Sequence, residues 1–349
     1  MLDFSKPNLW EHLQSTHKPI VLYGMGNGAD SIISRLDAQN IPHRGVFVSD
    51  GFVRDKIFHG HKLMSYDDAK AQFGDMIVLV SFGSSLPDVL TNMMRIAAEQ
   101  ELYAPYVPVI GDGDFNRKYA TEHYHNFMWV HDRFSDSLSR RTYENILKYR
   151  YSGDISYLLA CETDNDEIFS LLHLQNNSTF MDLGAYRGDT VAEFVHYCPN
   201  YNRIYALEPD RKTFDKLCQN TASLHDMHAI NAAAYSHSHG VEFAMRSGRN
   251  SLVSKSGCMI PSRSIDEILP SDEHISLIKM DIEGAEIPAI EGAERTIKMH
   301  KPKMRISCYH RIDDLFAIPK KVLSLRPDYK LYMRHRAYVP DWDTEFIFT

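Results

Sequence analysis

The sequence has few cysteines, no long apolar run and no excess of positive charge. Its five cysteines are odd in number, lie far apart and form no Cys-x-x-Cys pair, so we expect reduced thiols in a cytoplasmic protein rather than a disulfide framework or zinc site. No stretch approaches the ~18 to 20 apolar residues of a membrane span, and no basic segment leads into an apolar block as in a signal peptide. A net charge of −8 argues against nucleic acid as the main partner.

The first part of the sequence is a regular alternation of apolar strands and helices. Apolar runs at residues 19–26, 45–49 and 76–82 each stop at glycine or Asp-Gly, and helical stretches follow the first and the last. Apolar strands separated by helices of this length predict a parallel sheet that is covered on both faces. We therefore expect a small Rossmann-like α/β domain over residues 1–111.

Residues 112–177 differ in composition, being rich in aromatic residues, histidine and charge. Within them, residues 135–149 have helical spacing, with Leu138, Tyr143 and Ile146 available for one face. We predict a helical connector. Packing of the two flanking domains against each other is the favoured role, and a lid over the second domain's site is the alternative.

The last segment, residues 178–349, alternates strands and helices again. Because no helix separates its final two strands, we expect an α/β doubly wound sheet that ends in an antiparallel strand. The candidate strands are residues 179–183, 203–207, 228–233, 277–281, 303–308, 330–335 and 345–348, and the candidate helices lie near residues 190–196, 211–222, 285–299 and 319–325.

A glycine-containing loop follows the first strand of this segment, in the stretch FMDLGAYRGDT. In a doubly wound sheet the ligand lies beyond the carboxyl ends of the strands, where glycine exposes backbone N–H groups and a helix begins. The pattern formed by Asp182, Gly184 and Gly188 is not the G-x-G-x-x-G of a pyrophosphate cradle. It suits a ligand with amino and carboxylate groups, such as adenosylmethionine. Glu208 ends the next strand, before Pro209, where it can accept both ribose hydroxyls.

Several segments together resemble the FkbM family of adenosylmethionine-dependent methyltransferases. They are FMDLGAYRGDT, IYALEPD, INAAAYS, LIKMDIEGAEIPAIEGAERTI and ISCYHRIDDLFAIP, and the match runs from Phe180 to the C-terminus. The resemblance implies O-methylation of a hydroxyl on a sugar, glycan or polyketide-type acceptor. The stretch RNSLVSKSG departs from the small serine run of many members. Candidate donor-binding residues are Asp182, Gly184, Tyr186, Gly188, Thr190, Glu208, Pro209, Asp210 and Ala233.

The chemistry is expected at the ends of the fourth and fifth strands. An alcohol is a poor nucleophile, so its methylation needs a general base, a metal or strict positioning. Asp281 and Glu283 are the candidate acids, and His310 is a candidate base because its ordinary pKa near 6.5 suits neutral pH. Glu286 is explained by the preference for acids at helix N-termini. A divalent cation held by Asp281, Glu283 and His310 is possible but not favoured, so no metal ligand is assigned.

A second function is open at the N-terminal domain. Gly24, Gly26 and Gly28 follow an apolar strand, and Asp50 closes the next strand at the place of a ribose-binding acid. The alternative is therefore an NAD-linked or nucleotide-sugar enzyme, although loss of the ligand from this loop is slightly favoured. A third possibility is a binding protein with a vestigial donor site. The expected partner is a hydroxylated small molecule or glycan, with no nucleic acid.

Overall fold

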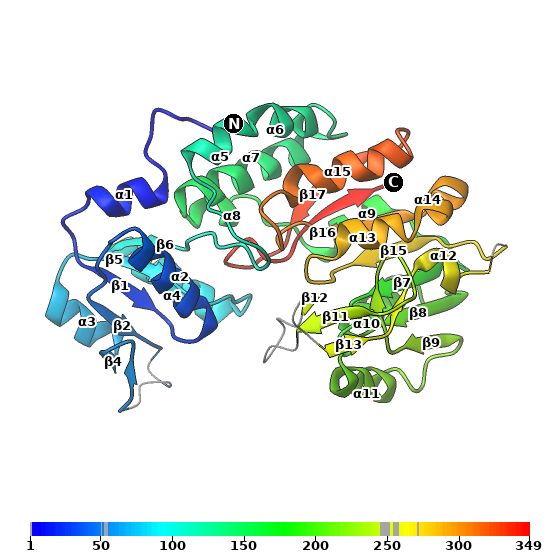
Figure 1. Ribbon diagram of the computed structural model, residues 1–349, viewed down its shortest axis with the longest axis horizontal. Coiled ribbons are helices and arrows are strands. Elements are labelled where there is room, and N and C mark those ends of the chain that lie inside the picture. The colour runs from blue at the N-terminus through cyan, green and yellow to red at the C-terminus, as the bar shows by residue number, and fades with distance from the viewer. Residues whose placement is uncertain (1, 50, 52–54, 245–251, 254–257, 271) are drawn as a thin grey trace.

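The computed structural model describes all residues except 1, 50, 52–54, 245–251, 254–257 and 271 (Figure 1). Two sheets lie toward opposite ends of the long axis, and the helices of residues 117–172 lie between and above them in this view. The expected α/β fold class is confirmed. No helix among the described residues has the length and apolarity needed to cross a membrane.

The N-terminal sheet has six strands. They are β1 (Ile20–Tyr23), β2 (Gly45–Phe47), β3 (Ile57–Phe58), β4 (His61–Met64), β5 (Ile77–Val80) and β6 (Glu101–Tyr103), with helices α1 (Leu9–Ser15), α2 (Asn27–Ala38), α3 (Tyr66–Phe73) and α4 (Pro87–Glu99). Their order is β3-β4-β2-β1-β5-β6, and every pair except β3–β4 is parallel. Every residue of β1 and β5 is buried, which explains their unbroken apolar runs.

The connector is helical, as the sequence predicts. Its helices are α5 (Arg117–Glu122), α6 (Tyr124–His131), α7 (Ser137–Ser152), α8 (Ser156–Leu159) and α9 (Asn165–Leu172). The Asp136 side chain accepts a hydrogen bond from the Ser139 N–H at the start of α7, and Gly153 ends this helix with φ +70°. Both caps are local signals, so the sequence places this helix well.

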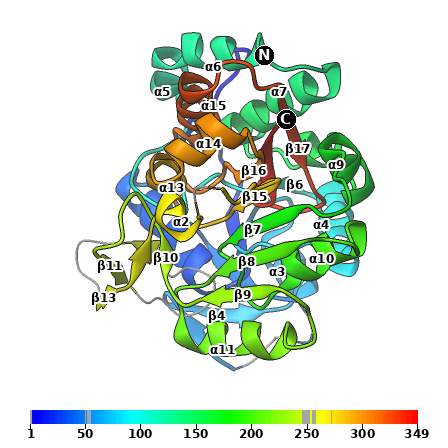
Figure 2. The ribbon, with the colours of Figure 1, turned by 90° about the vertical axis from the view of Figure 1, so that its right-hand side faces the viewer.

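The C-terminal sheet has seven strands. They are β7 (Thr179–Leu183), β8 (Arg203–Leu207), β9 (Met227–Ile230), β15 (Leu277–Met280), β16 (Lys303–Ser307), β17 (Leu331–His335) and β18 (Thr344–Phe348). Their order is β17-β18-β16-β15-β7-β8-β9, and Figure 2 shows β15, β7, β8 and β9 side by side. Strand β18 runs antiparallel to both β16 and β17, so the expected reversed final strand is confirmed.

The helices of this half are α10 (Asp189–Tyr197), α11 (Arg211–Asn220), α12 (Ile265–Ile268), α13 (Glu286–Glu291), α14 (Glu294–His300) and α15 (Asp314–Leu325). The single helix expected over residues 285–299 is therefore two helices. They separate at Gly292, where an added Cβ would lie 2.2 Å from the carbonyl oxygen of Tyr235. A neighbouring segment thus comes too close for a larger residue at this point.

The strand expected over residues 228–233 is also divided. It continues after β9 as β10 (Ala233–Ala234), which pairs with β14 (Ser262–Arg263) outside the main sheet. Between the two strands, the side-chain amide of Asn231 donates to the carbonyl oxygens of Glu208 and Pro209. The remaining small sheet comprises β11 (Val241–Ala244), β12 (Leu252–Val253) and β13 (Cys258–Ile260), and most of the RNSLVSKSG stretch lies outside the described residues.

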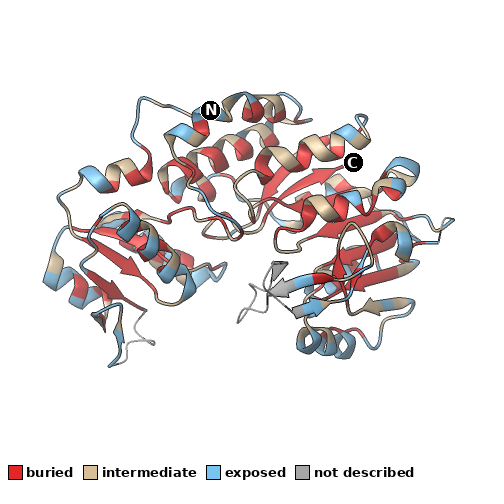
Figure 3. Ribbon diagram, viewed as in Figure 1, coloured by how far each residue is buried: buried red, intermediate tan, exposed pale blue. Residues whose placement is uncertain are grey.

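One apolar core joins the parts of the molecule. It contains Val21 and Phe47 of the N-terminal sheet, Tyr143 of α7, and Met280 and Phe346 of the C-terminal sheet. The central strands of both sheets are buried, whereas the edge strands β3 and β9 and most helices keep exposed residues (Figure 3). Burial of shared apolar surface therefore holds the two sheets and the connector together.

The connector packs at the far edge of the C-terminal sheet, on β17. There the buried Arg334 donates to the carboxylates of Asp136 and Glu167, each at 2.7 Å, and to the Ser139 hydroxyl at 2.8 Å. Strands β7 and β8, which carry the glycine loop and Glu208, lie toward the opposite edge of that sheet. This arrangement supports the packing role of the connector over the lid.

Candidate active site

Asp182 lies on β7 beside Lys279 of β15, its register partner in the neighbouring strand. The Lys279 Nζ is 3.2 Å from the Asp182 carboxylate, and the Thr190 hydroxyl donates to the same carboxylate. Burial raises the pKa of Asp182, while Lys279 and Thr190 oppose that effect. Lys279 Nζ also donates to the carbonyl oxygen of Gly184 at 2.9 Å. Asp182 and Lys279 together therefore hold the loop in shape, whereas the sequence indicated only that Lys279 pairs with acids.

The loop backbone occupies the left-handed region at three positions. The φ angles are +78° at Gly184, +48° at Tyr186 and +89° at Gly188, where α10 begins. The sequence predicts that Gly184 makes room for a ligand, but the structure gives another reason. A Cβ at Gly184 would lie 2.0 Å from the carbonyl oxygen of Asp281. The glycine thus allows the β7 loop to contact the end of β15.

Glu208 ends β8 and supports the same loop. One carboxylate oxygen accepts the Tyr186 N–H at 3.0 Å and the other accepts the Asp210 N–H at 2.8 Å. Burial raises the pKa of Glu208 to about 7, although these two hydrogen bonds oppose the shift. The residue is only 7% exposed, so it does not stand in the open cleft that the sequence suggested. Each oxygen keeps a second lone pair that can accept a hydroxyl.

The remaining donor candidates have local structural roles. Asp210 accepts hydrogen bonds from the N–H and the hydroxyl of Thr213 at 2.8 and 2.7 Å, which caps α11. Asn231 holds the backbone of Glu208 and Pro209, and the sequence-based search missed this residue. Ala233 is buried on β10, within the small parallel pair with β14 rather than within the main sheet.

Asp281 and Glu283 come together with His310, as the sequence predicts. The His310 Nε2 is 3.4 Å from an Asp281 oxygen and 3.6 Å from a Glu283 oxygen. The Tyr309 hydroxyl donates to Asp281 at 2.8 Å. Burial raises the pKa of Asp281, but Lys279, His310 and Tyr309 outweigh it and hold that pKa below its ordinary value. The Asp281 side chain is 36% exposed, so its charged carboxylate can reach a ligand.

His310 does not have the properties of a neutral base. Its side chain is fully buried, and Nδ1 is 2.9 Å from a carboxylate oxygen of Glu286. Burial lowers the pKa of His310, but Glu286, Asp281 and Glu283 together raise it to about 10. This raised pKa favours the charged imidazole at neutral pH, whereas a general base must be neutral.

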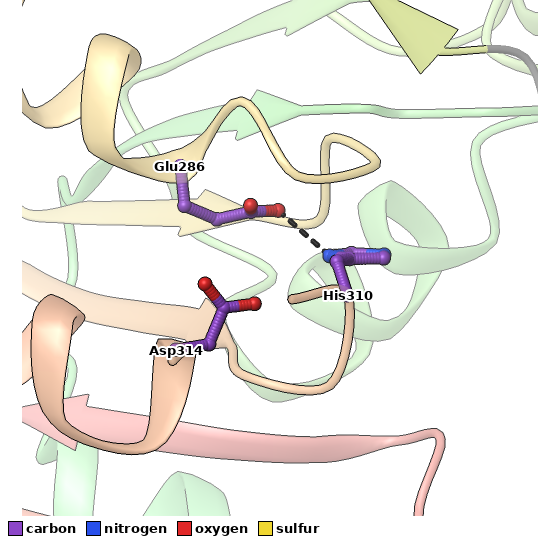
Figure 4. Close-up of side chains that lie close together, drawn as sticks. All are labelled: Glu286, His310 and Asp314. Atoms are coloured by element: carbon purple, nitrogen blue, oxygen red, sulfur yellow. Dashed lines mark ion pairs between the residues drawn. The ribbon is translucent and has the colours of Figure 1, made fainter. Parts of the chain in front are cut away.

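Two further buried acids surround His310 (Figure 4). Glu286 is the first residue of α13, and one of its oxygens accepts the Ile282 N–H at 3.1 Å. Asp314 is the first residue of α15 and accepts the Arg311 N–H at 2.7 Å. The sequence explains Glu286 by the helix dipole alone and does not single out Asp314. Glu286, His310 and Asp314 come from three separate elements, α13, the segment after β16 and α15, so their proximity is a property of the fold.

The N-terminal glycine loop borders a cavity of about 580 Å³ at the carboxyl ends of β1 and β5. Gly28 is required there by packing, because its Cβ would lie 2.1 Å from the carbonyl oxygen of Ser81. Asp50 lies outside the described residues. Two acids, Asp30 and Asp341, border the cavity, and none of the described lining residues is lysine, arginine or histidine. Asp341 is paired with the buried Arg150, and Asp30 lies 2.7 Å from His59.

Comparison with known proteins agrees with this geometry. Residues 182–340 match the family model described as the methyltransferase FkbM domain. The crystal structure of methyltransferase FkbM from Methylobacillus flagellatus KT superposes with a TM-score of 0.72 at 22% identity, covering 95% of this chain and 90% of that chain. An rRNA methylase from Streptococcus thermophilus superposes with a TM-score of 0.37 at 12% identity, covering 53% of this chain and 95% of that chain. No curated protein matches the sequence.

The first of these similarities extends the shared fold over nearly the whole chain, including the N-terminal sheet. The family match covers the part that carries the glycine loop, Glu208, Asp281 and His310. Residues 182–340 of this chain therefore match the methyltransferase FkbM domain, and nearly the whole chain shares the fold of the Methylobacillus protein.

Proposed function

We propose that the chain is an O-methyltransferase that uses adenosylmethionine to methylate a hydroxyl of a sugar, a glycan or a related acceptor. The observation that carries this proposal is the contact between two strand ends. The β7 loop at Gly184 lies directly against the backbone of Asp281 at the end of β15. A donor held by the loop and a hydroxyl held by Asp281 would therefore be neighbours.

The residues around the glycine loop fit adenosylmethionine. Glu208 has lone pairs left for two ribose hydroxyls after it has accepted the Tyr186 and Asp210 N–H groups. Helix α10 starts at Gly188, and no described side chain caps it, so its N–H groups can bind the donor carboxylate. The donor supplies a methyl group on a positively charged sulfur. The acids Asp281 and Glu283 next to the loop are complementary to that charge.

Asp281 has the role of holding the acceptor hydroxyl in line with the methyl group. Its carboxylate is charged and partly exposed, and the Tyr309 hydroxyl fixes its orientation. A hydroxyl oxygen becomes strongly acidic as its new bond to carbon forms, so even a carboxylate of lowered pKa can accept the proton late in the reaction. His310 acts through Asp281 as a positioning residue.

Methyl-labelled adenosylmethionine tests the proposal. The purified chain is incubated with the labelled donor and glycan fractions, and the products are separated by mass spectrometry. Cell-surface glycans from cells with and without the protein provide the acceptor panel. We expect a labelled ether on one sugar class, absent with the Asp281→Asn variant. Label on nitrogen or carbon in place of a hydroxyl oxygen would contradict O-methylation.

A further inference from the structure

We propose that Glu286, His310 and Asp314 form a binding site for a divalent transition-metal ion. The three side chains come from the start of α13, the segment after β16 and the start of α15 (Figure 4). One ligand atom from each residue lies within 4.8 Å of the others, and all three residues are buried. Ligand atoms about 2.0 to 2.2 Å from one ion lie at most about 4.4 Å apart, so small side-chain shifts would bring all three onto a common ion.

Unsatisfied polar atoms are the first support for the site. Within the described part of the chain, neither ring nitrogen of His310 nor the Oε2 of Glu286 has a hydrogen-bond partner. The other Glu286 oxygen lies 2.9 Å from His310 Nδ1 and forms an ion pair with it. Buried polar atoms without partners are rare, and they are the atoms that coordinate an ion.

The balance of charge is the second support. Glu286 and Asp314 place two carboxylates in the interior, and both are about 1% exposed. One imidazole can compensate for only one of them, whereas an unpaired buried carboxylate is costly. A divalent cation at the common centre compensates for both. His310 would then bind it through Nδ1, the nitrogen that faces Glu286.

The other side of the imidazole matches the usual surroundings of a metal-bound histidine. A histidine ligand commonly donates its second ring N–H to a carboxylate, which fixes the orientation of the ring. The Nε2 of His310 faces the oxygens of Asp281 at 3.4 Å and Glu283 at 3.6 Å. The ion would thus lie behind Asp281, on the buried side of His310, and would hold the ring that positions this acid.

One imidazole and two carboxylates favour Mn²⁺ or Zn²⁺ over Mg²⁺ and Ca²⁺, which prefer oxygen ligands and water. The site does not depend on methyl transfer, so it is tested without donor or acceptor. The full chain is stripped with chelator, incubated with Zn²⁺ or Mn²⁺, desalted and analysed for metal content. We expect one ion per chain, with at least ~10-fold weaker binding in Glu286→Gln and Asp314→Asn. Glu291→Gln, an exposed acid on the same α13, is the control and should bind normally.

A second measurement needs no variant and therefore does not depend on how the variants fold. Pulsed electron paramagnetic resonance of the Mn²⁺-loaded wild type should detect one directly bound imidazole nitrogen. Stoichiometric binding together with this nitrogen coupling supports the site. The proposal is overturned by a wild-type chain that retains neither ion, by equal affinity in the wild type and both variants, or by bound Mn²⁺ without a nitrogen ligand.

Discussion

Gly184 and Asp281 are in contact through their backbones, and a Cβ on Gly184 would lie 2.0 Å from the Asp281 carbonyl oxygen. The two residues follow adjacent parallel strands, β7 and β15. Their contact brings the glycine loop and the candidate catalytic acid to one point of the sheet edge. It also means that this glycine is required by the fold, whether or not a ligand is bound.

Replacing Gly184 should therefore destabilise the protein itself. In Gly184→Ala we expect a loss of about 2 to 5 kcal/mol in the free energy of unfolding, because left-handed strain and a backbone clash add together. Gly74 is a matched control with φ +67° and, in the described part of the chain, no atom within 4 Å of an added Cβ. Gly74→Ala should cost only the strain of a positive φ, about 1 to 3 kcal/mol. Denaturant unfolding measures both variants, and equal losses would refute the clash.

The elevated pKa of Glu208 predicts a pH-dependent stability. Its pKa is raised from the ordinary 4.5 to about 7 in the folded protein, so the folded state holds the proton more tightly than the unfolded state. Its contribution to stability is full below pH 4.5 and is lost as the pH rises through 7. Relative to Glu208→Gln, which does not titrate, the wild type should lose on the order of 3 kcal/mol across this window. A stability difference that stays constant with pH would place Glu208 in a solvated environment.

Substitutions of Asp281 and of His310 should change the kinetics of methyl transfer in different ways. Asp281→Asn should keep donor affinity and lower kcat by ~10² to 10⁴-fold, because it removes the acceptor of the proton. His310→Gln should lower kcat less, and the wild-type pH–rate profile should have no ascending limb near pH 6.5, the ordinary histidine value. Initial rates with a saturating donor provide the comparison. An ascending limb in the wild type that disappears in His310→Gln would restore histidine as the base.

The link between connector and C-terminal sheet depends on a buried ion pair. Arg150 of α7 donates to Asp341 at 2.7 Å and to the Cys308 carbonyl oxygen at 2.9 Å, and both charged side chains are almost fully buried. Arg150→Met leaves Asp341 unpaired, so we expect a loss of about 3 to 5 kcal/mol. Adding Asp341→Asn to this variant should recover part of the loss, since no buried charge then remains.

Arg211→Met is the control for this pair, because Arg211 pairs with Asp215 on the surface of α11. Exposed pairs contribute little, and a change below ~1 kcal/mol is expected. Unfolding by denaturant gives all the values. If the double variant is no more stable than Arg150→Met alone, the unpaired charge is not the cause.

The sequence predicted the parts of the fold that depend on signals from residues close together in the chain. The alternation of strands and helices and the absence of a helix before β18 are enough to derive the doubly wound sheet with its reversed strand. The division of residues 285–299 at Gly292 was not predicted; the space at this glycine is limited by the carbonyl oxygen of Tyr235, which comes from another part of the chain. The same holds for the break after β9, where Asn231 bonds to the end of β8.

Prediction of the candidate active site from the sequence was limited in the same way, because contacts between distant segments are not visible in the sequence. The order of motifs brought Asp281, Glu283 and His310 to one place, but it could not show how deeply the histidine is buried. Glu286, Asp281 and Glu283 raise the pKa of His310, and Glu286 approaches from a different element, which the sequence could not show. The role of His310 as a base stays a prediction. Likewise, the pairing of Asp182 with Lys279 follows from the register of two strands that are distant in sequence.

The central claim is that the C-terminal domain binds adenosylmethionine through the glycine loop and Glu208. Isothermal titration of the full chain with adenosylmethionine and, separately, with NAD tests it most directly. We expect binding of adenosylmethionine alone, weakened in Glu208→Ala by about 2 to 4 kcal/mol through the loss of charge-assisted hydrogen bonds. Asp215→Asn on the exposed face of α11 should leave the affinity unchanged. Binding of NAD without adenosylmethionine, or an unchanged affinity in Glu208→Ala, would contradict the account.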